Sequence, residues 1–297
     1  MAQSVRDRLL SRMRETGEEY QVLLTRFALE RLLYRLTRLP EGEDFVLKGA
    51  FTFLIWEGTL GRQTRDLDLL GSGSPDAERL LEILRRACQA EVSNDGVEYD
   101  AESLEVAPIR EGAEYEGLRA KFYAYIGSAR LRLQIDVGFG DAVTPPPEER
   151  TFPGLLDFPE PKVKAYRPET VVAEKLHGMA RYGRANTRMK DFYDIWRISK
   201  QTEISGRALT SAVQATFRRR ETALPEEVPI ALTETFTEEP GKKEQWEAFL
   251  RQVDRKEERL QAVISDLNEF LSPVFHAARG QEPLQGRWTE GGPWRNE

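Results

Sequence analysis

The chain has 297 residues, of which 40% are hydrophobic and 31% charged, and its formal net charge is −7. This length suits two modest domains or one larger α/β unit with a real core. The acidic charge argues against a surface built throughout for nucleic acid, although it leaves room for a local basic groove. A single cysteine, Cys88, excludes an internal disulfide, and only two histidines, His177 and His276, argue against a histidine-rich metal site. Because no apolar stretch has membrane-spanning length and no signal-peptide pattern is present, we expect the chain in the cytoplasm.

The first 70 residues are predicted to form two helices, then a strand, a glycine turn, a short helix and a second strand. Apolar residues at helical spacing predict the helices over residues 4–15 and 18–39. The first strand, residues 45–47, stops at Lys48-Gly49, and the short helix, residues 51–57, is ended by Gly58. The second strand covers residues 67–70.

Asp66 and Asp68 lie at the start of this second strand and are the first candidate functional residues. Side chains two apart on a strand point to the same face, so the two carboxylates are expected side by side. Two like charges at that distance favour a divalent cation with oxygen ligands, and magnesium is the expected ion. In the alternative interpretation both acids face solvent on an edge strand while the flanking leucines pack inward. Their neighbours favour a site, because Arg65 precedes the pair and the backbone of residues 49–52 offers N–H groups to phosphates.

The middle of the chain predicts the rest of a sheet. A helix is expected over residues 76–89, with Ser74 as its cap, followed by strands at 104–109, 118–126 and 131–137. Gly127-Ser128 suits a hairpin between the last two strands. The fold class is therefore α+β, with a mixed, mainly antiparallel sheet flanked by helices and a helical C-terminal region. Asp136 interrupts the apolar end of the last strand, so it is either exposed at the edge or buried for a reason.

Prolines between residues 141 and 167 indicate a crossover or domain boundary. We expect a first domain over residues 1–160 that includes the N-terminal helices, a helical domain over 161–277 that completes the active site, and a mobile tail over 278–297. In the helical domain, one helix runs from residue 168 to about 182, another begins near Lys190, and others cover 209–221, 243–251 and 257–271. The first two are joined by a basic segment that either contributes a local nucleic-acid groove or is simply a solvated surface; its cations are Arg181, Arg184, Arg188 and Lys190.

Several of these stretches resemble one known family. Gly49-Ala50 with Thr64-Arg65-Asp66-Leu67-Asp68 looks like the first motif of the polymerase-β-type nucleotidyltransferase superfamily, specifically of the AbiEii/AbiGii-like toxins. The resemblance continues at Glu174-Lys175-Leu176 and at Lys190-Asp191-Phe192-Tyr193-Asp194 and covers most of the chain. One departure is Ala50, which stands where the superfamily usually has a serine that helps to hold the triphosphate; Thr52 is the candidate substitute.

The resemblance implies a role for each matching residue. Asp66, Asp68 and Asp136 would hold the metals, two Mg²⁺ ions in the expected arrangement, with Asp136 as the third carboxylate from a neighbouring strand. Lys175 would neutralise charge on the triphosphate, and Asp191 would be a functional acid while Asp194 is structural. The nucleotide-binding residues would be Lys48, Gly49, Thr52, Arg65 and Lys190.

It also implies a function: a toxin of a bacterial toxin–antitoxin or phage-defence system that transfers nucleotides from a nucleoside triphosphate (NTP) to an RNA hydroxyl. The expected acceptor is the 3′ acceptor end of transfer RNA (tRNA), and a cognate antitoxin is the expected partner. Two alternatives stay open. One is a nucleotidyltransferase of the same fold that modifies a small molecule or a protein. The other is a catalytically silent interaction protein.

Overall fold

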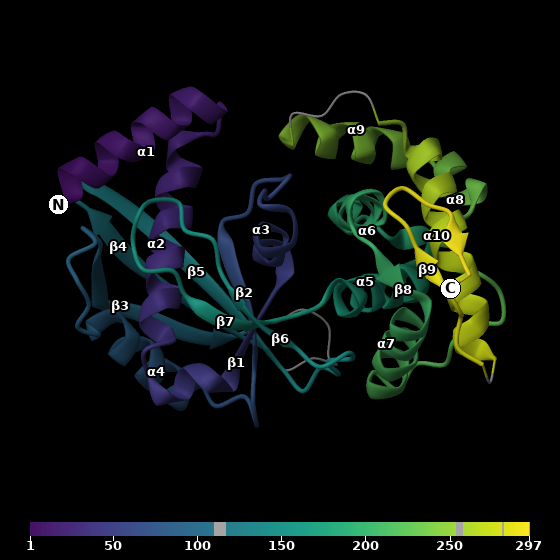
Figure 1. Cartoon of the computed structure of the whole chain (residues 1–297), viewed down its shortest axis with the longest axis horizontal. Helices are drawn as coiled ribbons and strands as arrows, with labels where there is room; N and C mark the ends of the chain where they lie inside the picture. The colour runs from purple at the N-terminus through teal and green to yellow at the C-terminus, as the bar shows by residue number, and fades with distance from the viewer. Residues whose placement is uncertain (110–116, 254–257, 281, 297) are drawn as a thin grey trace. The chain divides into compact units, whose positions relative to one another are not determined.

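The computed structural model describes residues 1–109, 117–253, 258–280 and 282–296 (Figure 1). The chain divides into two compact units. Unit 1 comprises Met1–Gly140 and Glu148–Ala165, and unit 2 comprises Asp141–Pro147 and Tyr166–Glu297. Of the helices that the structure describes, none is long and apolar enough to cross a membrane.

Unit 1 is built on a seven-stranded sheet with the order β3-β4-β5-β2-β1-β7-β6. The pairs β2–β5 and β1–β7 are parallel and the other neighbouring pairs are antiparallel. The predicted mixed, mainly antiparallel sheet is thus confirmed. The strands are β1 (Phe45–Lys48), β2 (Asp66–Gly71), β3 (Glu98–Pro108), β4 (Gly117–Ile126), β5 (Ala129–Phe139), β6 (Glu148–Thr151) and β7 (Lys162–Ala165).

Helices cover the core face of this sheet. They are α1 (Ala2–Thr16), α2 (Tyr20–Leu36) and α4 (Ala77–Gln89), and α2 crosses the strands in Figure 1. Alternation along β2, β4 and β5 sends every second side chain into the core, which includes Leu67, Phe122 and Ile135. The short connections are η1 (Pro40–Asp44), η2 (Gly49–Phe51) and α3 (Thr52–Glu57). The cap of α4 is Asp76, whose side chain accepts a hydrogen bond from the Arg79 backbone, and not Ser74 as the sequence predicted.

Strands β6 and β7 are absent from the sequence prediction, which treated residues 141–167 as an irregular crossover. β7 extends the sheet by pairing in parallel with β1, and β6 pairs antiparallel with β7. Both strands are only four residues long and rich in charged residues. They therefore lack the apolar alternation that makes a strand recognisable.

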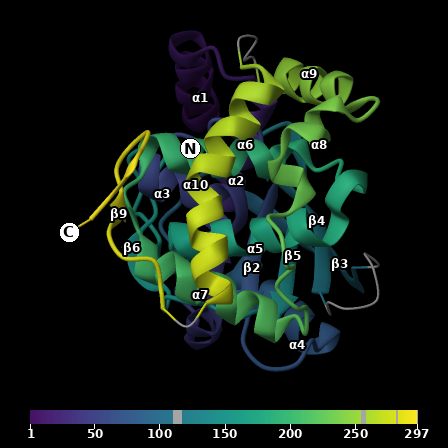
Figure 2. The same cartoon turned by 90° about the vertical axis from the view of Figure 1, so that its right-hand side faces the viewer.

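Unit 2 is mainly helical. Its elements are α5 (Pro168–Tyr182), η3 (Gly183–Ala185), α6 (Met189–Gln201), β8 (Ile204–Ser205), α7 (Gly206–Arg219), η4 (Ile230–Leu232), α8 (Glu234–Glu238), α9 (Lys242–Gln252), α10 (Leu260–Arg279), β9 (Arg287–Trp288) and β10 (Trp294–Arg295). The predicted helical C-terminal region is confirmed. Figure 2 shows the long helix α10 with the C-terminal strand β9 beside it.

The segment predicted as a mobile tail is folded in the structure. β9 pairs with both β8 and β10 to form a three-stranded sheet. Trp288 is 2% exposed, and the rings of Trp288 and Trp294 lie 4.9 and 5.8 Å from the ring of Phe270 on α10. Each indole N–H also donates a hydrogen bond to a backbone carbonyl, Trp288 to Ser199 and Trp294 to Phe270. The buried Trp288 and the partly buried Trp294 thus hold this segment in place despite its glycine- and proline-rich composition.

Candidate active site

Strand β2 positions the first two acids. It lies between β1 and β5, and its alternation buries Leu67 and Leu69, at 0% and 1% exposure, in the core. Asp66 and Asp68 therefore project together from the opposite face and are partly exposed. Since β2 is an inner strand, the alternative interpretation of an exposed edge strand is wrong.

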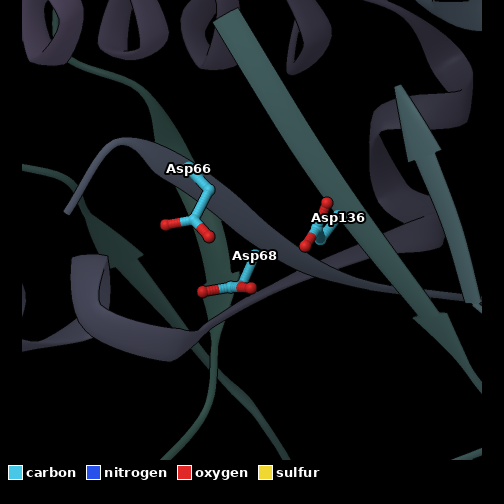
Figure 3. Close-up of side chains that lie close together, drawn as sticks. All are labelled: Asp66, Asp68 and Asp136. Carbon is cyan, nitrogen blue, oxygen red and sulfur yellow. The ribbon is translucent and has the colours of Figure 1, made fainter. Parts of the chain in front are cut away.

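Strand β5 brings the third acid to the same place. It runs parallel to β2 with Asp136 directly beside Asp68. One carboxylate oxygen from each of Asp66, Asp68 and Asp136 lies within 4.8 Å of the other two (Figure 3). Three negative charges at this separation repel one another strongly unless cations lie among them. The cluster has the oxygen donors and the spacing that a divalent cation requires.

Each acid of this carboxylate cluster is held by a different neighbour. The Thr64 hydroxyl donates a hydrogen bond of 2.7 Å to Oδ1 of Asp66. Asp68 lies against the backbone of Gly49, which has φ +69°, and a Cβ atom built on Gly49 would lie only 2.0 Å from Oδ2 of Asp68. Glycine is thus required at position 49 both by its backbone conformation and by the space that Asp68 occupies.

Asp136 is held by Arg119 of β4. The guanidinium donates from Nε to Oδ1 at 2.8 Å and from Nη2 to Oδ2 at 2.7 Å, a bidentate ion pair. Sequence reasoning missed Arg119, although a signal was present. The hairpin predicted at Gly127-Ser128 fixes the register of its two strands, and that register places Arg119 directly opposite Asp136.

The predicted nucleotide-binding residues of unit 1 lie around the same acids. Lys48 pairs with Asp68 across the β1–β2 ladder, and Arg65 is exposed immediately before β2. Thr52 differs from the expectation: it is fully buried, and its hydroxyl donates a 2.7 Å hydrogen bond to the Gly49 carbonyl. This contact stabilises the glycine turn, so Thr52 does not present its hydroxyl in the way that the missing serine at position 50 would.

In unit 2, the predicted site residues Lys175, on α5, and Asp191, on α6, contact each other. The ammonium group lies 2.6 Å from a carboxylate oxygen of Asp191 and 2.9 Å from one of Asp194, both on α6. Arg188 contacts the second oxygen of Asp191 at 2.7 Å. Burial alone would raise the pKa of Asp191, but the charges of Lys175 and Arg188 and the hydrogen bond from Lys175 hold that pKa below its ordinary value. Asp191 and Asp194 are 2% and 1% exposed, so the two acids share one structural environment.

The basic segment between α5 and α6 is exposed and well anchored. Arg181, Arg184, Arg188 and Lys190 are all exposed, and Tyr182 between them is 44% exposed. Beneath them, the buried Asn186 accepts a hydrogen bond from the Arg188 backbone through its side chain and one of 2.7 Å from Lys242 through its carbonyl. The segment therefore presents cations and an aromatic ring from an ordered backbone.

Comparisons with known proteins place the chain in a family. The family described as "Nucleotidyl transferase AbiEii toxin, Type IV TA system" matches over residues 31–273, and no curated protein matches the sequence. Two crystal structures from Helicobacter pylori are similar. A candidate nucleotidyltransferase has a TM-score of 0.46 and 13% identity, with 88% of this chain and 97% of that chain covered. JHP933 has a TM-score of 0.41 and 14% identity, with 88% and 99% covered. On the strength of the family match, the chain belongs to the AbiEii family of nucleotidyl transferase toxins of type IV toxin–antitoxin systems, a membership that implies nucleotidyl transferase activity, a nucleotide substrate and an antitoxin partner.

Proposed function

We propose that this protein is a metal-dependent toxin that transfers a nucleotidyl group from an NTP to an RNA hydroxyl, at the 3′ acceptor end of tRNA. The observation that carries the proposal is the carboxylate cluster of Asp66, Asp68 and Asp136, whose oxygens approach within 4.8 Å of one another.

Asp66, Asp68 and Asp136 are the metal ligands in this proposal. The cluster suits Mg²⁺, because this ion binds through one or two carboxylates and completes its shell with water and substrate phosphates. When bound, paired metal ions neutralise charge on the phosphates and on the attacking and leaving oxygens. The protein holds the three carboxylates in fixed positions. Strands β2 and β5 are inner strands of the sheet, the Gly49 backbone lies against Asp68, and the Thr64 hydroxyl donates a hydrogen bond to Asp66.

Cationic side chains hold the phosphates. In unit 1 these are Lys48 and Arg65, beside the glycine turn at Gly49, which lies against Asp68. For Lys175 and Lys190 of unit 2 we keep the role that the family resemblance implies, which is to supply positive charge to phosphate groups. Because Asp191 and Asp194 contact the Lys175 ammonium through one carboxylate oxygen each, we assign both acids the role of orienting that lysine.

The acceptor is a nucleic acid, supported by the basic segment of unit 2. Four exposed cations lie between residues 181 and 190, with no acid in that range, in a chain whose net charge is −7. Tyr182 adds an exposed ring, and unpaired bases stack on aromatic side chains with a free energy of roughly 1–3 kcal/mol. An exposed tyrosine among arginines suits the single-stranded end of an RNA better than a small metabolite.

The test is a labelling reaction. The purified chain is incubated with Mg²⁺ and with one of the four NTPs, labelled at the α-phosphate. Separate reactions contain tRNA, total RNA, a protein extract or a small-molecule extract as the acceptor. We expect label on tRNA from one preferred NTP, lost on chelation and lost when periodate oxidises the tRNA 3′ diol. Asp66→Asn and Asp68→Asn should abolish labelling, whereas Asp157→Asn, at a carboxylate of unit 1 that is 98% exposed, should not.

Other outcomes distinguish the alternatives. Label on a small molecule or on a protein, with none on RNA, would leave a nucleotidyltransferase with a different acceptor. No label on any fraction, together with a growth phenotype that survives Asp66→Asn and Asp68→Asn, would identify a catalytically silent interaction protein.

A further inference from the structure

The ion pair between Arg119 and Asp136 lies inside the proposed metal site. Arg119 and Asp136 face each other across the antiparallel β4–β5 ladder. Their two hydrogen bonds measure 2.8 and 2.7 Å, and their side chains are 33% and 15% exposed. The pair is therefore well formed, partly shielded from water and stronger than an ordinary surface ion pair.

This pairing makes Asp136 differ from Asp66. Both oxygens of Asp136 accept hydrogen bonds from a full positive charge, whereas Asp66 accepts one from the neutral hydroxyl of Thr64. Each carboxylate oxygen still has a second lone pair, so the guanidinium does not block coordination outright. It does place a cation where a divalent ion would have to approach, and like charges so close repel.

We propose that Arg119 is a positioning residue that competes with a divalent cation for Asp136. In the absence of metal it offsets one of the three negative charges and fixes the carboxylate on the site-facing side of β5. A cation that uses Asp136 must weaken this ion pair, so it binds less tightly than it would if Arg119 were absent. The inference rests on the proposed metal-dependent function and adds a residue that sets how readily the third carboxylate joins the site.

Lys121 on β4 provides a control that distinguishes the pairing of Arg119 with Asp136 from a general effect of positive charge on the metal site. Lys121 is the next residue on the same face of β4, where its ladder neighbours are Gln134 on β5 and Glu105 on β3, so it lies beside neither Asp136 nor another acid of the carboxylate cluster. Side chains on one face repeat every two residues, about 6.8 Å along an antiparallel strand. Lys121→Gln thus removes one positive charge from nearly the same place without breaking the pair with Asp136.

The experiment measures Mn²⁺ binding to the full chain by electron paramagnetic resonance of the free ion, without nucleotide, and by thermal unfolding with and without chelator. The variants are Arg119→Gln, Arg119→Lys, Lys121→Gln, Asp136→Asn and the double variant Arg119→Gln/Asp136→Asn. We expect Arg119→Gln to tighten Mn²⁺ binding about tenfold, because a hydrogen-bonded charge pair no longer opposes it. In chelator, Arg119→Gln should unfold at a lower temperature than the unmodified chain. Mn²⁺ should raise the unfolding temperature of Arg119→Gln by more than it raises that of the unmodified chain.

The other variants test the cause. Arg119→Lys, which keeps the charge, and Lys121→Gln should both bind within about threefold of the unmodified chain, since 0.7 kcal/mol or less separates such affinities. The effect of Arg119→Gln should disappear when Asp136 is already asparagine. A merely structural role would lower stability without tightening Mn²⁺ binding.

Four results would overturn the inference. Unchanged or weaker Mn²⁺ binding by Arg119→Gln, or an equal gain from Lys121→Gln, would reject it while leaving the proposed metal-dependent function intact. A tenfold gain that persists in the Asp136→Asn background would also reject it. If the unmodified chain bound no divalent cation with or without an NTP, the proposed function itself would fail, and this inference with it.

Discussion

Replacing Gly49 by alanine tests the site through its backbone without removing any charged group. Gly49 has φ +69°, and a Cβ atom there would lie 2.0 Å from Oδ2 of Asp68 and 2.7 Å from its Cβ and Cγ. The change therefore has two effects, a backbone strain and a collision. Gly58 provides the matched control, because its φ is +70° and nothing lies within 4 Å of a Cβ atom built there.

The two effects have different magnitudes. Holding an alanine in the left-handed region costs about 1–2 kcal/mol, so both variants should lose that much unfolding free energy. Only Gly49→Ala must also move Asp68: real Cβ contacts do not fall below 3.0 Å, so a 2.0 Å approach requires a shift of about 1 Å. A misplacement of that size at a reacting centre lowers a rate by roughly 100-fold.

The assay compares initial rates of nucleotidyl transfer and urea unfolding for both variants. We expect both variants to lose unfolding free energy, and Gly49→Ala to lose more because of the collision with Asp68. The rate should stay near that of the unmodified chain for Gly58→Ala and be about 100-fold lower for Gly49→Ala. Divalent-cation affinity should fall only for Gly49→Ala. Equal rates for the two variants would refute the argument that the turn at position 49 positions Asp68.

Further predictions concern pH and the acceptor. Burial raises the pKa of Glu30 from 4.5 to about 7, although the hydrogen bond from the Leu155 backbone N–H acts in the opposite direction. The free energy of unfolding should therefore fall by on the order of 3 kcal/mol as the pH rises from 4.5 to 7. In Glu30→Gln, urea unfolding should show a weaker dependence on pH. Burial, and to a smaller extent the charges of Arg220 and Arg181, lowers the pKa of His177 from 6.5 to about 4. The free energy of unfolding should therefore decrease as the pH falls from 6.5 to 4, and His177→Gln should remove this decrease. Tyr182→Ala and Arg184→Gln should each raise the KM for RNA several-fold without changing the KM for NTP, whereas the exposed cation replaced in Arg218→Gln should leave both unchanged.

The parts of the fold that the sequence predicts are those with strong periodicity and clear ends. The helix α5 begins and ends at the predicted residues, Pro168 and Tyr182, because proline favours the first helical position and Gly183 follows the last. The hairpin of β4 and β5 follows from alternation around Gly127-Ser128. The charged strands β6 and β7 are stabilised by pairing with β1 and with each other, a tertiary effect that no local pattern records.

Some residues of the candidate site can likewise be predicted from the sequence and others cannot. Asp66, Asp68 and Asp136 are found from strand alternation and resemblance, and the structure brings them together. Arg119 could be predicted from the hairpin register but not from composition, since Lys121 on β4 and Arg130 and Arg132 on β5 also alternate with apolar residues. The ion pair between Asp194 and Lys175 could not be predicted from the sequence, because it depends on how α5 packs against α6.

The most direct measurement is anomalous diffraction from crystals of the full chain grown with Mn²⁺ and a non-hydrolysable NTP. The account predicts manganese peaks within coordination distance of Asp66 and Asp68, with Asp136 contacting one of them and the triphosphate bound against the same ions. Ordered triphosphate bound elsewhere in the protein, or an Asp66–Asp68 pair without manganese while the nucleotide is present, would contradict it.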